Sequence, residues 1–222
     1  MKAILFGASG MVGQGVLKEC LKDPVVAEVL SIGRSPLGIS DPKVKEVVHK
    51  DFTDFSNMET QWKGYDACFF CLGISSAGMS EPDYRHITYD FTLAAAGPLA
   101  RLNPQMTFVF VSGTGTDSTE KGRVMWARVK GAAENAILKL PFKAAYMFRP
   151  GAIQPMDGIT SKTKMYNVLL KLFGWLFPVL RKLFPRHVTT TRILGRAMIK
   201  AAREGAPVKW LENPDINALG GE

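Results

Sequence analysis

Short apolar segments alternate with longer amphipathic segments along the first two thirds of the chain. The apolar segments at residues 3–6, 29–32, 45–49, 67–72, 107–111 and 144–148 have the lengths of strands. Between them, apolar residues recur at helical spacing, as Val16, Leu17 and Leu21 do. We therefore predict an α/β fold, a doubly wound parallel sheet of the Rossmann type with helices on both faces.

The boundaries of the expected helices follow from turn and capping residues. The first helix begins near Met11 and ends at Asp23-Pro24, because the residue before a proline is pushed out of the helical region. Further helices are expected at about 84–99, from 125 to Pro141, and from a threonine cap at 189–191 to about 205. Residues 208–211 are a candidate last strand, and 213–222 are expected to be loose.

The strand and helix alternation ceases after residue 151. We expect one domain over residues 1–222, with 152–188 forming a small helical lid or substrate region within it. The stretch 165–184 is very apolar, but its longest uncharged run, 172–180, is too short to span a bilayer, and Gly174 and Pro178 interrupt it. A lid over a pocket, contact with a membrane surface and an oligomer interface all remain open for this stretch.

A glycine turn follows the first strand, with Gly7, Gly10 and Gly13 three residues apart. Gly7 suits a turn with positive φ, Gly10 lets a phosphate approach the main chain, and Gly13 permits close helix–strand packing. A diphosphate would lie at the N-terminus of the following helix, where free N–H groups and the helix dipole favour an anion. The spacing matches the usual dinucleotide fingerprint only approximately, and an ordinary turn without a ligand is the alternative.

The end of the second strand bears on the choice of cofactor. An acidic residue there would bind the ribose 2′-hydroxyl of NAD, whereas an arginine accommodates the 2′-phosphate of NADP. The sequence has Arg34 followed by Ser35 and no acid, which favours NADP over NAD unless Arg34 is only a solvated loop residue.

Two further strand ends are candidates for cofactor contact. Asp51 and Phe52 could border the adenine, although Asp51 or Thr53 could instead cap a helix. The fourth strand, residues 67–72, ends at Gly73-Ile74-Ser75, where small residues let the main chain pass close to a cofactor. Cys68 and Cys71 have the spacing of a redox or metal pair, but residues three apart on a strand point to opposite faces, so we predict core cysteines and no metal.

The residues that follow resemble the short-chain dehydrogenase/reductase superfamily, in its atypical, extended and epimerase-like branch. The resemblance covers residues 4 to about 151. It rests on the glycine turn, Arg34, Asp51, the hydroxyl-rich turn at Ser112, Lys130 in its helix and the triplet 149–151. It implies oxidoreductase chemistry on NADP, with NAD the less favoured cofactor.

In that family a tyrosine and a lysine four residues apart act with a serine or threonine. Lys130 matches the lysine, and Ser112 or Thr114 the hydroxyl, but Trp126 stands in place of the tyrosine. An indole does not give up a proton in a useful pH range, so it cannot act as the acid. Tyr84, His86 or Tyr89 could supply the proton instead, unless they are packing or surface residues.

The full set of predicted site residues is as follows. The catalytic candidates are Lys130, Ser112 and Thr114, with Trp126 at the tyrosine's place. The cofactor candidates are Gly7, Ser9, Gly10, Met11, Val12, Gly13, Arg34, Ser35, Asp51, Phe52, Cys71, Leu72, Gly73, Lys130, Arg149, Pro150 and Gly151. A small, apolar carbonyl or hydroxyl compound is the expected substrate, and a non-catalytic NADP-binding sensor or docking protein is the alternative.

Composition and charge narrow the picture further. The net charge of +8 arises largely between residues 159 and 203, which hold ten Lys or Arg and no acid. No nucleic-acid motif accompanies this charge, so nucleic acid is not an expected partner. The three cysteines fit a reducing compartment, and no signal peptide is recognisable at the N-terminus, so a cytoplasmic location is expected.

Overall fold

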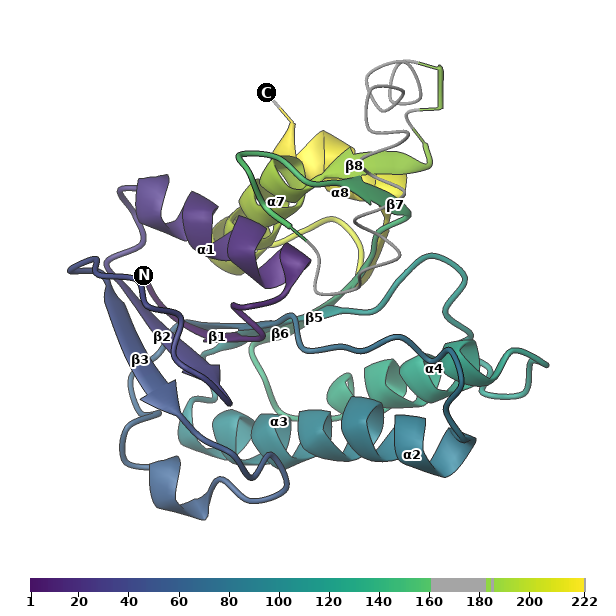
Figure 1. Cartoon of the computed structure of the whole chain (residues 1–222), viewed down its shortest axis with the longest axis horizontal. Helices are drawn as coiled ribbons and strands as arrows, with labels where there is room; N and C mark the ends of the chain where they lie inside the picture. The colour runs from purple at the N-terminus through teal and green to yellow at the C-terminus, as the bar shows by residue number, and fades with distance from the viewer. Residues whose placement is uncertain (161–182, 185, 222) are drawn as a thin grey trace.

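A parallel sheet forms the centre of the molecule (Figure 1). The computed structural model describes residues 1–160, 183–184 and 186–221. Within them, seven parallel strands lie in the order β3-β2-β1-β4-β5-β6-β9. Their bounds are β1 Lys2–Phe6, β2 Glu28–Gly33, β3 Val44–Val48, β4 Ala67–Phe70, β5 Thr107–Val111, β6 Ala144–Arg149 and β9 Trp210–Glu212. The expected doubly wound α/β class is confirmed, and the strand order reverses between β1 and β4.

Helices cover both faces of this sheet (Figure 1). One face carries α1 Met11–Lys22, α7 Thr191–Glu204 and α8 Asn213–Gly220. The other carries α2 Glu81–Arg85, the π-helical turn η2 His86–Asp90, α3 Phe91–Leu102 and α4 Met125–Ile137. A single 3-10 turn, η1, spans Ser56–Met58.

The alternation of side chains along the strands builds a separate core on each face. Leu5 and Phe69 are buried on the face of α1 and α7, whereas Phe6 and Phe70 are buried on the opposite face with Phe52. Because both faces of the sheet are covered, the central strands β1, β4 and β5 are almost entirely apolar and buried. Packing on both faces holds the carboxyl ends of β1 and β4 in fixed positions.

Several predicted elements differ at their ends. The helix expected from about residue 84 begins at Glu81, because Ser80 caps it by accepting a hydrogen bond from the Asp83 N–H at 3.3 Å. The helix beginning at 191 has the predicted threonine cap, since the Thr190 hydroxyl accepts from the Ile193 N–H at 3.0 Å.

The expectation that residues 213–222 are loose is wrong for the described part. Residues 213–220 form α8, which packs against α7. A capping box between Glu212 and Asp215 starts this helix, and Pro214 lies in its first turn, where its missing N–H costs nothing.

The region expected to form a helical lid, 152–188, is described only in part. At its two ends, β7 Ala152–Gln154 and β8 Val188–Thr190 form a small parallel sheet that the sequence pattern did not indicate. Residues 161–182 and 185, and with them most of the apolar stretch 165–184, lie outside the described residues. Among the residues that are described, no helix has the length and apolar content needed to cross a bilayer.

Candidate functional site

A groove runs along the carboxyl ends of the central strands, where the strand order reverses. Three adjoining cavities make up this groove. We call them the first, middle and third cavities, and their volumes are about 250, 420 and 390 Å³. Ile74 and Ser75 border all three, and the loop they belong to follows β4. Open α/β sheets bind their ligands at this position, so the groove is the candidate site.

The glycine turn forms one wall of the groove, and its geometry requires glycine at two positions. Gly7 has a φ of 80°, and a Cβ on it would lie 2.7 Å from the main-chain oxygen of Cys71. A Cβ on Gly13 would lie 2.1 Å from the oxygen of Gly7, so α1 packs directly on the turn. The two glycines therefore let the main chain of the turn lie at the edge of the cavity.

The N-terminus of α1 opens into the same groove. Gly10 is the N-cap residue, and it makes no side-chain capping hydrogen bond. The first turn of α1 contains no acidic residue, and Gly10, Met11 and Val12 border the middle cavity. Uncapped N–H groups without a nearby carboxylate suit a phosphate, so these residues fit the diphosphate of a dinucleotide.

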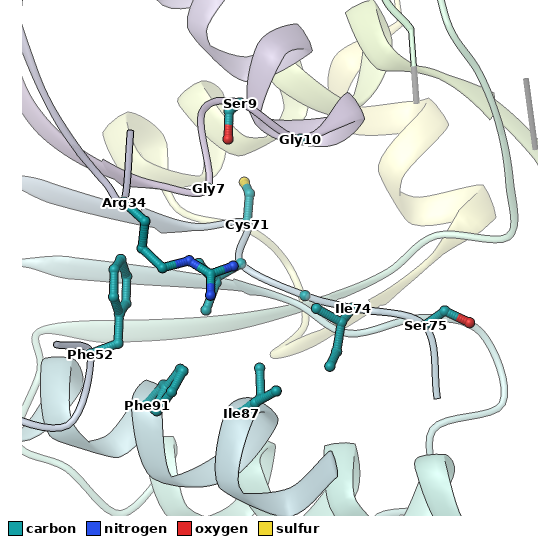
Figure 2. A pocket seen from close by; sticks show the side chains of 12 residues that line it. Gly7, Ser9, Gly10, Arg34, Phe52, Cys71, Ile74, Ser75, Ile87 and Phe91 are labelled. Atoms are coloured by element: carbon teal, nitrogen blue, oxygen red, sulfur yellow. The ribbon is translucent and has the colours of Figure 1, made fainter. Parts of the chain in front are cut away.

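Arg34 and aromatic side chains border the first cavity. Figure 2 shows the Arg34 side chain extending from the end of β2 into the space between the glycine turn and the α2–α3 helix. Phe52 and Phe91 lie on the far side, with 5.9 Å between their ring centroids. A flat apolar wall beside a guanidinium is suited to an adenosine phosphate.

Two predicted cofactor residues lie apart from this cavity. Ser35 is exposed and does not border it. Asp51 is also exposed, and its Oδ1 accepts hydrogen bonds from the N–H and hydroxyl of Thr53, at 2.8 and 2.5 Å. These bonds hold the pKa of Asp51 below its ordinary value. Asp51 therefore caps a local turn, and it is Phe52 that faces the groove.

The residues that end β4 contact the groove as a group. Cys71, Leu72 and Gly73 border both the first and the middle cavity. Cys68 packs in the core on the α3 side, and Cys71 packs against the core on the α1 side, so the two thiols point to opposite faces as predicted. Burial raises the pKa of both thiols, which keeps them protonated.

Lys130 projects from α4 into the groove. Its Nζ donates a hydrogen bond to the main-chain oxygen of Ser112 at 2.6 Å and lies 3.5 Å from that of Val111. Burial lowers the pKa of this ammonium to about 8, although the charge of Glu134 opposes the shift. The ammonium is thus held at the end of β5, where it borders the middle and third cavities.

Ser112 and Arg149 both contact a buried carboxylate, and Ser112 also borders the middle and third cavities. The Ser112 hydroxyl donates to the Oε1 of Glu134 at 2.5 Å, and Arg149 pairs with both oxygens of that carboxylate, Nε lying 3.0 Å from Oε1. Glu134 is fully buried. A buried carboxylate needs such partners, so these two side chains stabilise the packing of α4 against β5 and β6.

The third cavity holds the remaining polar candidates. Thr114 and Trp126 border it together with Lys130, and Pro150 and Gly151 also line it. The Thr114 side chain is exposed, and its hydroxyl donates to the main-chain oxygen of Arg149 at 3.0 Å. Of the two hydroxyl-bearing residues of the turn after β5 that border this cavity, Ser112 and Thr114, the more exposed is therefore Thr114.

Of the three proposed substitutes for the missing tyrosine, Tyr84 borders the third cavity. His86 and Tyr89 do not: the His86 Nδ1 lies 3.1 Å from the Asp90 Oδ2, and the Tyr89 ring lies under the Arg85 guanidinium at 4.0 Å. Burial raises the pKa of Tyr84.

The sequence pattern did not single out Ile87 and Phe91, which border the first cavity from the helix that also carries Tyr84. Ile74 and Ser75, at the expected strand end, border the same cavity from the loop after β4. The spacing of Tyr84, Ile87 and Phe91, three and then four residues apart, is the signal that one helical face meets the groove.

The basic block that carries the net charge is partly paired within the molecule. Of its described members, Arg192 pairs with Asp157 at 2.7 Å and Arg196 with Glu19 at 3.0 Å. Arg203 pairs with Glu204 at 2.5 Å. These pairs place part of the positive charge in contacts of α7 with α1 and with the loop after β7.

The chain is similar to several curated proteins. Over 152 residues it is 28% identical to Protein HTATIP2 of Rattus norvegicus, and this match covers 67% of the chain and 61% of that protein. Over 226 residues it is 28% identical to "Protein FMP52, mitochondrial" of Debaryomyces hansenii, covering 99% of the chain and 95% of the relative. No protein-family model matches the chain.

The names of the fungal relatives contradict the cytoplasmic location expected from the sequence. FMP52 proteins of Scheffersomyces stipitis, Aspergillus oryzae and Debaryomyces hansenii are all called mitochondrial. Three unpaired cysteines argue only against an oxidising compartment and do not distinguish among reducing ones. The expectation therefore rested on evidence that could not select the cytoplasm.

Solved structures share the fold at low sequence identity. Gre2 from Candida albicans in complex with NADPH has a TM-score of 0.70 and 14% identity, covering 95% of this chain and 77% of that one. A short chain dehydrogenase from Burkholderia cenocepacia in complex with NADP has a TM-score of 0.66 and 16% identity, covering 99% and 91%. The Bordetella bronchiseptica enzyme WbmF in complex with NAD+ has a TM-score of 0.66 and 13% identity, covering 99% and 78%. The expected fold is confirmed, and the fold alone does not select between the two cofactors.

Proposed function

We propose that this chain, which has the fold of short-chain dehydrogenase/reductase structures, binds NADP(H) along the groove and reduces a small, apolar carbonyl compound. One observation carries the proposal. The uncapped N-terminus of α1, the Arg34 guanidinium and the Lys130 ammonium all border one continuous groove. Along the groove, Arg34 would bind the 2′-phosphate of the adenosine, the N-terminus of α1 the diphosphate, and Lys130 the hydroxyls of the nicotinamide ribose.

The lining of the first cavity supports NADP rather than NAD. Its lining residues include Arg34 and no carboxylate. A 2′-phosphate gains charge-assisted hydrogen bonds from a guanidinium, whereas a 2′-hydroxyl needs an acidic partner for tight binding. Arg34 is exposed and extends into the cavity, so its guanidinium is accessible to the 2′-phosphate of a bound nucleotide (Figure 2).

The third cavity offers apolar surface and hydrogen-bond donors to a small carbonyl compound. Ile74, Trp126 and Pro150 supply apolar surface there, and Thr114 and Lys130 supply hydrogen-bond donors. NADPH supplies a hydride to the carbonyl carbon when it is bound. Thr114, after rotation of its hydroxyl, donates to the carbonyl oxygen, and the Lys130 ammonium stabilises negative charge that develops nearby.

A non-catalytic NADP-binding protein is the second candidate, and Trp126 favours it. The indole occupies the position at which the family resemblance requires a phenol, and it borders the third cavity. Its N–H can donate a hydrogen bond but cannot deliver a proton. Cofactor binding without turnover is the expected behaviour if no other group acts as the acid.

Fluorescence titration of the purified protein with NADPH and NADH tests the cofactor. We expect NADPH to bind about ten times more tightly or better, which corresponds to about 1.4 kcal/mol from the Arg34 contact. Equal affinities, or no binding of either nucleotide, would overturn the proposal. Absorbance at 340 nm with a panel of aldehydes, including hexanal and benzaldehyde, then separates the two candidates. NADPH oxidation supports the reductase, whereas activity that appears only in Trp126→Tyr supports the non-catalytic protein.

A further inference from the structure

Tyr84 brings a phenol to the cavity in which the resemblance lacks one. It lies on α2 and borders the third cavity together with Thr114, Trp126 and Lys130. We infer that Tyr84 donates the proton to the substrate oxygen, which makes it a catalytic residue of the proposed reduction, on which this inference rests.

The helix that carries Tyr84 is fixed against the helix that carries Trp126 and Lys130. The Arg128 Nη2 lies 2.5 Å from the Glu81 Oε2, which joins the first turn of α2 to α4. Tyr84 is one turn beyond Glu81, and Arg128 lies between Trp126 and Lys130 on α4. This ion pair therefore fixes α2, which carries Tyr84, against α4, which carries Lys130.

A π turn directly after α2 gives that helix an irregular path along the groove. The Phe91 N–H bonds to the oxygen of His86, five residues back, where an α-helix would use four. Tyr84 borders the third cavity before this turn, and Ile87 and Phe91 border the first cavity within and after it. Isolated π turns are concentrated at functional sites, and this one lets a single helix follow two cavities of the groove.

The surroundings of Tyr84 suit a proton donor. The side chain is 2% exposed, so the neutral phenol is favoured over the phenolate at neutral pH. The Lys130 ammonium borders the same cavity and favours the phenolate once the proton has left. Tyr84 thus holds its proton before the reaction and has a cation nearby to stabilise the charge that follows.

The step balances as a carbonyl reduction. The carbonyl carbon receives a hydride from the dihydronicotinamide, the electron pair of the C=O π bond moves to oxygen, and that oxygen takes the phenolic proton of Tyr84. The carbonyl compound is reduced to an alcohol and NADPH is oxidised to NADP+. The Tyr84 phenolate then takes a proton from water.

Kinetics with hexanal and benzaldehyde test the role, with Tyr89→Phe as the matched control. Tyr84→Phe should lower kcat/KM by about 100-fold or more while it leaves NADPH affinity unchanged, because only the proton donor is lost. Tyr89→Phe should stay within about twofold of wild type. Adding Trp126→Tyr to Tyr84→Phe should restore activity, which a purely structural role of Tyr84 would not permit. If Tyr84→Phe keeps its turnover, the proposed role of Tyr84 is overturned but the proposed reductase activity is not. If the wild-type protein binds NADPH without turnover, both are overturned.

A spectroscopic experiment tests the position of Tyr84 without turnover. In protein labelled with 13C at tyrosine Cζ, the Tyr84 resonance is identified by its loss in Tyr84→Phe. It should differ between the NADP+ and NADPH complexes, because only the oxidised nicotinamide ring carries a positive charge. The Tyr89 resonance should be the same in both complexes. A Tyr84 resonance that does not distinguish the two complexes overturns the inference, even where both nucleotides bind.

Discussion

The Ser112 hydroxyl donates its hydrogen bond to the buried Glu134 carboxylate, with 2.5 Å between Oγ and Oε1, so its proton is already engaged within the protein. Thr114, two residues later, has an exposed hydroxyl that borders the third cavity. The turn after β5 therefore contributes one hydroxyl to the packing of the molecule and another to the candidate site.

Removing each of these two hydroxyls in turn should affect stability in one variant and activity in the other. Ser112→Ala should lower the free energy of unfolding by about 1.5–3 kcal/mol, because a buried carboxylate loses a hydrogen bond. Thr114→Val should change stability by under about 0.5 kcal/mol but lower aldehyde turnover at least tenfold. Urea denaturation and NADPH oxidation measure the two effects, and the opposite pattern would restore Ser112 as the catalytic hydroxyl.

Arg149→Met should be among the most destabilising single changes. It leaves the fully buried Glu134 without its guanidinium partner, and breaking such a pair costs about 3–5 kcal/mol. Urea denaturation measures the loss. Arg101→Met is the control, because its pair with Glu59 lies at the surface, and it should cost under about 1 kcal/mol. Similar values for both variants would show that the Glu134 pair contributes little.

Arg34→Ala should weaken NADPH binding at least tenfold and leave NADH binding nearly unchanged. The reason is that only NADPH carries the 2′-phosphate that the guanidinium is proposed to hold. Fluorescence titration of both nucleotides gives the ratio directly. Arg85→Ala, which removes a guanidinium that does not border the first cavity, serves as the control and should leave both affinities unaltered. Equal weakening of the two nucleotides by Arg34→Ala would indicate a contact to the diphosphate instead.

Gly13→Ala should destabilise the fold by more than about 3 kcal/mol. The new Cβ would lie 2.1 Å from the main-chain oxygen of Gly7, and neither α1 nor the turn can shift without the other. Gly97→Ala is the matched control, because that glycine lies inside α3 with no atom within 4 Å of a new Cβ. It should change stability by at most about 1 kcal/mol, in the stabilising direction. Thermal unfolding of the pair tests whether α1 is as close to the turn as described.

The stability of wild type relative to Lys130→Met should depend on pH. Burial lowers the pKa of Lys130 from an ordinary value near 10.5 to about 8, so between these values the unfolded chain binds more protons than the folded chain. The free energy of unfolding of wild type should therefore rise relative to the variant from pH 8 towards pH 10.5, by about 3 kcal/mol at most. Urea denaturation of both proteins at pH 7.5, 8.5 and 9.5 measures this difference. A constant difference would show that Lys130 has an ordinary pKa.

The parts of the fold that follow from local pattern were predictable. The strand at 107–111 and the helix beginning at Met125 agree with the structure, because an apolar run and helical spacing are patterns of neighbouring residues. The helix at 213–220 has an equally local signal, the pairing of Glu212 with Asp215, but its low apolar content concealed it. The short pairing of 152–154 with 188–190 joins distant segments and leaves no local pattern.

The location of the candidate site could be predicted from the sequence, but the contacts of several of its side chains could not. The glycine turn, Arg34 and Lys130 reach one groove, because the parallel topology brings the ends of consecutive strands together. The hydrogen-bond partners of the Ser112 and Arg149 side chains depend on Glu134, which is buried on α4. This burial cannot be predicted from the sequence around Ser112 or around Arg149. The choice of Tyr84 over Tyr89 depends on the path of one helix, which includes an irregular turn.

The close packing of α1 on α7 has a consequence for how the chain acquires its fold during synthesis. A Cβ on Gly15 would lie 2.7 Å from the Cβ of Thr191, and one on Gly220 would lie 2.1 Å from the oxygen of Ile193, so α1, α7 and α8 share their buried surfaces. The glycine turn that α1 supports therefore lacks its covering layer until residues 191–220 have left the ribosome. We expect nascent chains shorter than this to remain protease-sensitive and unable to retain a nucleotide.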